Sequence, residues 1–173
     1  MGRKYNLWSF ILCLFLIVLS FQALYATYTR TWQVAPSALT LWIFTIVTFV
    51  IGCIGFKDKS SIWARLRSWF TVSTSILLSI IFLLGVCVNA IATEHIETVQ
   101  SPDAKIIIDF YTLNGGAATS ISVTGIVNGP LWFKKRIYYE GPMDRVDVEW
   151  IDNSIITINN HTLNLEKGEF YSN

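Results

Sequence analysis

One uncharged stretch, residues 70–92 of the 173-residue chain, constrains the fold more than any other feature of the sequence. As a helix it would be about 35 Å long, enough to cross a hydrocarbon core of about 30 Å. Two more uncharged, largely apolar runs precede it, at 7–27 and 37–56, and the second begins just after Pro36, a residue that suits the first turn of a helix. The sequence therefore predicts three transmembrane helices at 7–27, 37–56 and 70–92.

The charged residues divide the chain into two parts of opposite chemistry. Residues 1–93 carry seven of the 13 basic side chains and one of the 12 acidic ones, and residues 94–173 carry the rest. Hydrophobic residues make up 53% of the sequence, too many for one ordinary soluble domain, while the chain is too short for a large transporter. We therefore expect a membrane domain at 1–93 and a small water-soluble domain at 94–173.

The basic residues that flank the apolar runs predict the orientation of the chain. They concentrate before the first run and between the second and the third, at Arg3, Lys4, Lys57, Lys59, Arg65 and Arg67. Only Arg30 lies between the first two runs. Because positive charges favour the cytoplasmic side, we expect a multi-pass plasma-membrane protein with a cytoplasmic N-terminus and an extracytoplasmic domain at 94–173.

Small and hydroxyl-bearing residues recur along one side of the second and third runs. They predict faces on which helix backbones approach closely, with hydroxyl groups able to bond across the contact. These candidate packing residues are Thr45, Thr48, Gly52, Gly55, Ser75 and Ser79. No Asp, Glu, Lys, Arg or His occurs inside the three runs, so the sequence lacks the charged relay that is typical of pumps and transporters.

The last part of the chain has the pattern of short strands separated by turns. Six runs of β-forming residues occur at 105–112, 119–127, 131–140, 146–150, 155–158 and 162–165, after a polar connector at 93–97. The final pair flanks Asn159 and Asn160, which tolerate the positive φ of a tight hairpin. The pattern predicts an all-β antiparallel domain, either a sandwich or a barrel.

One predicted strand carries a stripe of basic and aromatic side chains. Strict alternation would put four residues on one face, Trp132, Lys134, Arg136 and Tyr138, with Lys135 on the other. Such a stripe can bind anionic head groups, wall polymers or a peptide through charge and cation–π contact. The alternative is a solvated sheet face whose cations pair with Asp147 and Glu149 on a neighbouring strand.

The sequence contains no motif for catalysis, a metal or a cofactor. All three cysteines lie in the apolar runs, so the soluble domain has no thiol for a disulfide, a zinc site or a nucleophile. The two histidines, His95 and His161, lie near no nucleophile motif, and no phosphate-binding loop is present. We therefore expect no cofactor, no metal and no enzymatic activity.

Several motifs of the predicted β domain together resemble a known family. They lie at 101–105, 109–111, 114–117, 129–138, 148–152 and 158–159, with Leu163. The Gly-Pro-Leu-Trp-Phe-Lys-Lys core at 129–135 is the most distinctive of them. Across residues 98–169 the chain looks like an uncharacterised Bacillus-type family of membrane-associated proteins with a C-terminal domain of unknown function. The resemblance implies a Gram-positive host and brings no known activity.

These features favour a protein that works by binding. We expect an accessory or regulatory protein of the envelope, in contact with membrane lipids and with another membrane or exported protein, because three short spans with small-residue faces suit docking. Nothing in the sequence suggests a nucleic-acid partner. The alternative is a self-immunity protein whose outer domain captures an exported toxin or bacteriocin.

Overall fold

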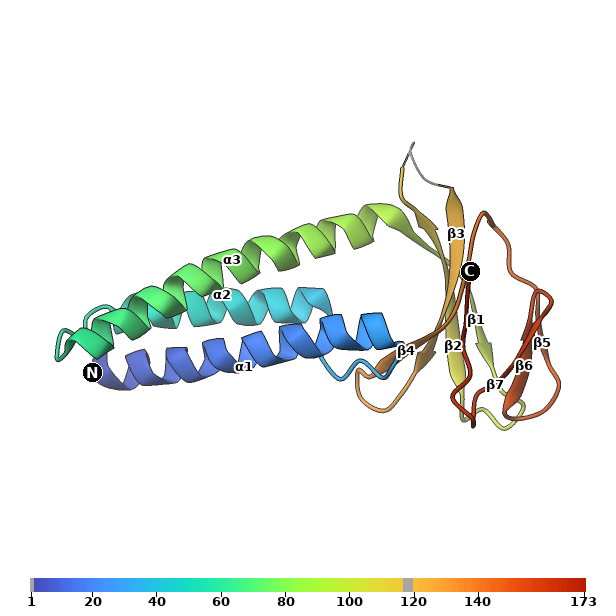
Figure 1. Cartoon of the computed structure of the whole chain (residues 1–173), viewed down its shortest axis with the longest axis horizontal. Helices are drawn as coiled ribbons and strands as arrows, with labels where there is room; N and C mark the ends of the chain where they lie inside the picture. The colour runs from blue at the N-terminus through green and yellow to red at the C-terminus, as the bar shows by residue number, and fades with distance from the viewer. Residues whose placement is uncertain (1, 117–119) are drawn as a thin grey trace. The chain divides into compact units, whose positions relative to one another are not determined.

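The structure is a computed structural model that describes residues 2–116 and 120–173 (Figure 1). Its helices come first in the chain and its strands follow. The helices are α1 (Gly2–Thr29), α2 (Ala38–Gly55) and α3 (Ile62–Ala92). The strands are β1 (Thr93–Gln100), β2 (Ile107–Asn114), β3 (Ile121–Asn128), β4 (Lys134–Glu140), β5 (Val148–Trp150), β6 (Ile155–Ile158), β7 (His161–Asn164) and β8 (Tyr171–Ser172).

The chain divides into two compact units. The first contains Met1–Gln22 and Ala35–Val88, and the second contains Ala23–Val34 and Asn89–Asn173. The second unit therefore includes the last turns of α1 and the segment that follows them, together with all the strands. The sequence alone suggested a soluble domain made only of residues after position 93.

All three helices are long and apolar enough to cross a membrane, which agrees with the three predicted spans. Two of them begin at a serine cap, since Ser37 Oγ accepts a hydrogen bond from the Thr40 amide and Ser61 Oγ accepts one from the Ala64 amide. The Ser61 cap explains why α3 starts well before residue 70, where the uncharged run begins. The first turns of α3 thus carry Arg65 and Arg67 and precede the uncharged run.

Small residues of the first unit lie where the helices touch. Thr45, Thr48, Gly52, Gly55 and Ser75 are all buried. A side chain at Gly52 would come within 3.1 Å of Thr71 Cγ2 on α3, so the helices approach closely here. The two threonines bond backbone carbonyls of their own helix, Trp42 O and Phe44 O, rather than bonding across the contact.

Two hydrogen-bonded contacts join α3 to the other helices. Ser79 Oγ accepts the indole N–H of Trp42 at 3.0 Å, which links α3 to α2. The amide of Asn6 on α1, only 1% exposed, donates to Ala64 O at 2.8 Å and to Ser68 Oγ at 2.6 Å. The side-chain oxygen of Asn6, Oδ1, accepts a hydrogen bond from Arg67 Nε at 3.0 Å, so both the nitrogen and the oxygen of this buried side-chain amide have partners.

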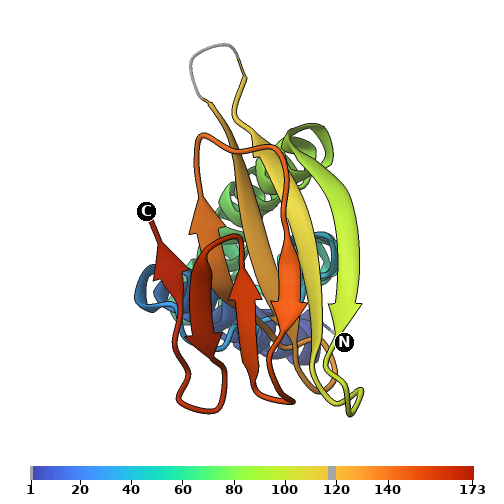
Figure 2. The same cartoon turned by 90° about the vertical axis from the view of Figure 1, so that its right-hand side faces the viewer.

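The strands form a two-layered sandwich and not a closed barrel. The larger sheet has the order β1-β2-β3-β4-β8 and the smaller one the order β5-β6-β7, and Figure 2 looks onto the smaller sheet with the larger one behind it. Apolar side chains from both sheets meet in one core. Its buried members are Ile108, Phe110, Val123, Val127, Ile137, Tyr138, Ile156, Ile158 and Leu163.

Among the described residues, the structure adds two strands to the six that the sequence predicted. Residues 93–97, predicted as a polar connector, begin β1, which pairs antiparallel with β2 at the edge of the larger sheet. β8 is a further strand of two residues, and it pairs parallel with β4, so the larger sheet is not wholly antiparallel. Both strands are at sheet edges, where few side chains are buried and the apolar alternation that identifies a strand is weak. The start of the predicted strand 119–127 lies outside the described residues.

Candidate functional site

A β-bulge in β4 separates the four residues of the predicted stripe. Gly125 of β3 pairs with Tyr138, but the next residue, Ile126, pairs with Arg136, so Ile137 is an extra residue in β4. Because a bulge shifts the alternation, Ile137 and Tyr138 are both buried in the core. The predicted stripe is therefore wrong for Tyr138, which lies on the face opposite Lys134 and Arg136.

Trp132 also lies outside the expected strand. It is in the turn that precedes β4, where the Phe133 amide donates to Pro130 O at 3.2 Å. Its side chain is 51% exposed, and its indole N–H donates to the backbone carbonyl of Val34 at 2.7 Å. Of the four predicted residues, only Lys134 and Arg136 share a face as expected, and Lys135 lies on the opposite one.

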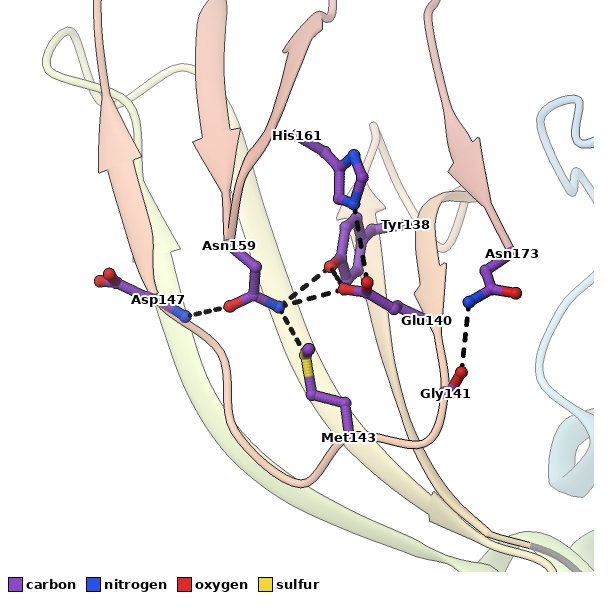
Figure 3. A network of polar contacts seen from close by, with 8 residues as sticks. All are labelled: Tyr138, Glu140, Gly141, Met143, Asp147, Asn159, His161 and Asn173. Atoms are coloured by element: carbon purple, nitrogen blue, oxygen red, sulfur yellow. Dashed lines mark hydrogen bonds and ion pairs between the residues drawn. The ribbon is translucent and has the colours of Figure 1, made fainter.

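The buried hydroxyl of Tyr138 belongs to a polar cluster that sequence reasoning did not anticipate (Figure 3). The hydroxyl donates a hydrogen bond to the Glu140 carboxylate and accepts one from Asn159 Nδ2 at 2.9 Å. Asn159 Oδ1 in turn accepts the Asp147 amide at 2.8 Å. The Asn159 side chain, which follows β6, therefore links Tyr138 on β4 of the larger sheet to Asp147, just before β5 of the smaller sheet.

His161 lies at the partly exposed side of this cluster. Its Nε2 is 3.6 Å from Glu140 Oε1, and the two side chains are 33% and 16% exposed. The imidazole ring stacks on the ring of Tyr171, with centroids 3.6 Å apart and planes inclined by 20°. β8 is thus held by ring stacking from its neighbour across the sandwich as well as by its pairing with β4.

The cluster shifts the ionisation of its two acidic groups in opposite directions. The hydrogen bond from Tyr138 lowers the pKa of Glu140 below its usual value of 4.5. Burial opposes this effect, and the hydrogen bond from the Asn159 amide adds to it. Burial and the neighbouring carboxylate raise the pKa of the Tyr138 phenol above its usual 10.0. The carboxylate is therefore ionised and the phenol neutral at pH 7, an arrangement that suits a hydrogen bond rather than proton transfer between them.

No sequence motif identifies this cluster, because its members come from separate strands. Asn159 was expected only as a turn residue, and its φ of 45° agrees with that expectation. Its position in the β6–β7 turn also aims its amide at β4, which the local pattern does not indicate. The observed contacts make the cluster a connection between the two sheets.

A groove of about 400 Å³ lies on the same side of the larger sheet as the sandwich core. Its walls include Trp32 from the segment after α1, Ile106 before β2 and Ile137 of β4. Lys135 of β4 and four residues after β7 also line it: Leu165, Glu166, Gly168 and Glu169. Lys135 Nζ donates to Gly168 O at 3.1 Å across it. A side chain at Gly129 would come within 2.6 Å of the Trp32 ring, so a glycine is required for that ring to form the wall.

The described residues contain no group of three His, Cys, Asp or Glu side chains that is close enough to hold a metal ion. His95 contacts Thr98 Oγ1 at 3.0 Å and packs edge-on against the Tyr111 ring. The two histidines of the sequence therefore lie in different surroundings, each engaged with side chains of its own sheet or of the facing one.

Comparison with protein families identifies the class to which the chain belongs. Residues 60–172 match a family of unknown function, DUF5412, and the chain belongs to this family. The matched region begins just before α3 and ends at the last residue of β8, so it includes every strand of the sandwich. No curated protein and no solved structure gives a significant match.

Proposed function

We propose that this chain is a non-catalytic integral protein of the plasma membrane in a Gram-positive, Bacillus-type envelope. In this proposal the β domain lies outside the membrane and binds another membrane or exported protein, and the chain acts as an accessory or regulatory component. The observation that carries the proposal is the groove beside Trp32, a concave surface whose lining combines apolar and charged residues.

The lining of the groove suits a segment of a protein partner. Trp32, Ile106 and Leu165 supply apolar contact, while Lys105 and Glu166 supply charges of both signs. An apolar centre with a polar rim is the usual composition of a protein-binding surface. A volume of about 400 Å³ is large enough for a few side chains of a bound peptide.

The polar cluster supports a binding role rather than catalysis. Its carboxylate, phenol and imidazole are residue types that enzymes use for acid–base chemistry. Here the Tyr138 hydroxyl is hydrogen-bonded to Glu140 and Asn159, and the His161 ring is stacked on Tyr171. These contacts join the two sheets and give the binding domain a fixed shape.

The orientation has its own test, which uses single cysteines in a chain whose three native cysteines are replaced. A cysteine at Asn173 should react with an impermeant maleimide in intact cells, and one at Lys59 should react only after lysis. The basic residues between α2 and α3 are the reason for this expectation. The reverse labelling pattern would overturn the extracytoplasmic assignment.

The groove is tested by photo-crosslinking in intact cells. A photoreactive amino acid at Glu166, in the groove, should crosslink to one discrete protein, and the same amino acid at Glu149, exposed on β5, should not. Replacing the groove residue Leu165 by Arg should abolish the crosslink. Equal crosslinking at both positions would contradict a specific partner in the groove, and a discrete adduct with an exported peptide would favour the self-immunity alternative.

A further inference from the structure

A second, smaller pocket lies on the other face of the larger sheet. It has a volume of about 90 Å³ and is lined chiefly by Ala26, Thr27, Arg30, Ile126, Lys134 and Arg136, all from the second compact unit. The pocket and the groove share no lining residue. Along β4, Lys134 and Arg136 line the pocket whereas Lys135 and Ile137 line the groove, as the two faces of a sheet require.

The segment after α1 pairs with the start of β4 through backbone hydrogen bonds. The Gln33 amide donates to Lys134 O at 2.8 Å, and the Lys134 amide donates to Gln33 O at 3.3 Å. Arg30 has a φ of 57°, a left-handed conformation of the kind that ends helices, and it turns the chain away from the axis of α1. Its guanidinium donates to Ser172 Oγ of β8 at 3.3 Å, so both sides of the pocket are held in place.

Three positive side chains therefore converge on a cavity of small size. Among the described residues, none of Arg30, Lys134 and Arg136 forms an ion pair with a carboxylate. Burial and the nearby charge of Arg30 lower the pKa of the Arg136 guanidinium, as is expected where two like charges line one cavity. An arginine nevertheless remains protonated at physiological pH, so both guanidinium groups are positively charged.

The carboxylate on this face of the sheet is engaged elsewhere. Asp109 on β2 pairs with Ile126 on β3, and Ile126 pairs with Arg136 on β4. The backbones of Asp109 and Arg136 are therefore two strand spacings, about 10 Å, apart. The Asp109 oxygens accept hydrogen bonds from Asn128 Nδ2 at 2.6 Å and from Thr98 Oγ1 at 2.7 Å. Burial raises the pKa of Asp109, but the hydrogen bonds from Asn128 and Thr98 and the charge of Lys134 together lower it, so Asp109 offsets part of the Lys134 charge.

We propose that this pocket binds the phosphodiester group of an anionic phospholipid, with Arg30 and Arg136 as the principal donors and Lys134 as the third cation. Guanidinium groups donate paired hydrogen bonds to phosphate oxygens, so the two arginines in the lining suit this ligand better than two lysines would. The inference goes beyond the proposed protein partner and does not rest on it, because that partner occupies the groove on the other face.

The size and the surroundings of the pocket favour a lipid head group. At about 90 Å³ the cavity holds several water-sized groups but is smaller than the roughly 300–1,000 Å³ of sites that enclose a whole organic ligand. It therefore takes only the anionic end of a larger molecule. Ala26 and Thr27 belong to the end of an apolar helix, beside Tyr25 and Tyr28, which are 64% and 89% exposed as in an interfacial aromatic belt.

The test uses the purified full-length protein in a neutral maltoside detergent, with native mass spectrometry to count bound lipid. Dioctanoylphosphatidylglycerol should bind as one molecule per chain, and dioctanoylphosphatidylcholine should bind more weakly. Arg136→Gln and Arg30→Gln should each weaken phosphatidylglycerol binding by about tenfold or more, the loss expected for a charge-assisted hydrogen bond. Arg136→Lys should retain part of the affinity, since it keeps the charge and loses the paired geometry.

Arg145→Gln is the matched control, because Arg145 is exposed before β5 and lines neither cavity. It should leave binding unchanged. Raising the salt from about 0.1 M to about 1 M shortens the screening length from about 10 Å to about 3 Å and should weaken binding of the wild-type protein. Removing one of two repelling cations should not lower the melting temperature, so a loss of lipid by Arg136→Gln cannot be ascribed to unfolding when the melting temperature is retained.

Three results would overturn the proposal. The first is equal binding of phosphatidylglycerol and phosphatidylcholine by the wild-type protein. The second is undiminished phosphatidylglycerol binding by Arg30→Gln combined with Arg136→Gln. The third is saturation by inorganic phosphate at a concentration at which phosphatidylglycerol does not bind, which would make the pocket a site for free phosphate and not for a lipid.

Discussion

The indole N–H of Trp132 donates a hydrogen bond to the backbone carbonyl of Val34, a residue 98 positions earlier in the chain. Together with the paired backbone bonds between Gln33 and Lys134, it joins the segment after α1 to the start of β4. This junction separates the groove, which Trp32 lines, from the basic pocket, which Arg30 lines. Both candidate binding sites therefore depend on the same short segment.

Replacing Trp132 by Phe should loosen this junction. The change keeps an aromatic ring next to Phe133 but removes the donor to Val34, a loss of about 0.5–1.5 kcal/mol. Hydrogen exchange of the Gln33 amide, whose acceptor is Lys134 O, should become faster. Leu131→Ala, at a side chain that is 82% exposed, is the control and should leave this exchange rate unchanged. An unchanged rate in Trp132→Phe would mean that the backbone bonds alone hold the segment.

The Tyr138–Glu140 pair should make the stability of the sandwich depend on pH at both extremes. The Glu140 pKa is lowered in the folded state, so its contribution is present above pH 4.5 and is lost as the pH falls below that value. The Tyr138 pKa is raised in the folded state, so its contribution is present below pH 10.0 and is lost as the pH rises further. Chemical denaturation across this range should show a plateau between two declines.

Tyr138→Phe should remove the alkaline decline and lower stability at neutral pH by about 1.5–3 kcal/mol, the value of a hydrogen bond to a charged group. Tyr139→Phe is the matched control, since Tyr139 is the next residue of β4 and points away from the core. It should change stability by about 0.5 kcal/mol or less. An alkaline decline that persists in Tyr138→Phe would assign it to another group.

Much of this architecture could be predicted from local sequence patterns. The uncharged runs identify three helices because a membrane requires long apolar segments, and α2 begins at Ala38, next to the predicted position. The β6–β7 hairpin follows from its asparagines, since Asn159 has the positive φ that a tight turn needs. In each case the determining interactions lie within a few residues of one another.

The features that were missed depend on contacts between distant residues. The bulge at Ile137 cannot be read from alternation alone, although two adjacent apolar side chains, Ile137 and Tyr138, are compatible with it. The pairing of Gln33 with Lys134 likewise has no local signal. The bulge decides which face Tyr138 occupies, and the pairing brings the segment that carries Arg30 beside β4, so the candidate site was less predictable than the fold.

Two glycines of the helical unit provide a matched test of helix packing. A Cβ at Gly52 would be 3.1 Å from Thr71 Cγ2 and 3.2 Å from Val72 Cγ2, whereas a Cβ at Gly85 would have no neighbour within 4 Å. Gly52→Ala should therefore destabilise the bundle by about 1–3 kcal/mol, as overpacking usually does. Gly85→Ala should be neutral or stabilise α3 by up to about 1 kcal/mol through helix propensity. Thermal unfolding in detergent measures both, and equal effects would contradict the close α2–α3 contact.

Trp150 separates the contribution of apolar packing from that of an unpaired polar group. Its ring packs against the sandwich core, opposite Ile156 of β6, while its indole N–H is buried without a partner among the described residues. Trp150→Ala should cost about 3–5 kcal/mol because it removes a large apolar side chain and leaves a cavity. Trp150→Phe keeps most of the ring and removes the unpaired donor, whose burial costs about 1–3 kcal/mol, so it should cost far less and can raise stability. Denaturant unfolding of the full-length protein, followed by circular dichroism in the β region, compares the two variants. A loss in Trp150→Phe as large as that in Trp150→Ala would show that the indole N–H has a partner, such as an ordered water, on which the core depends.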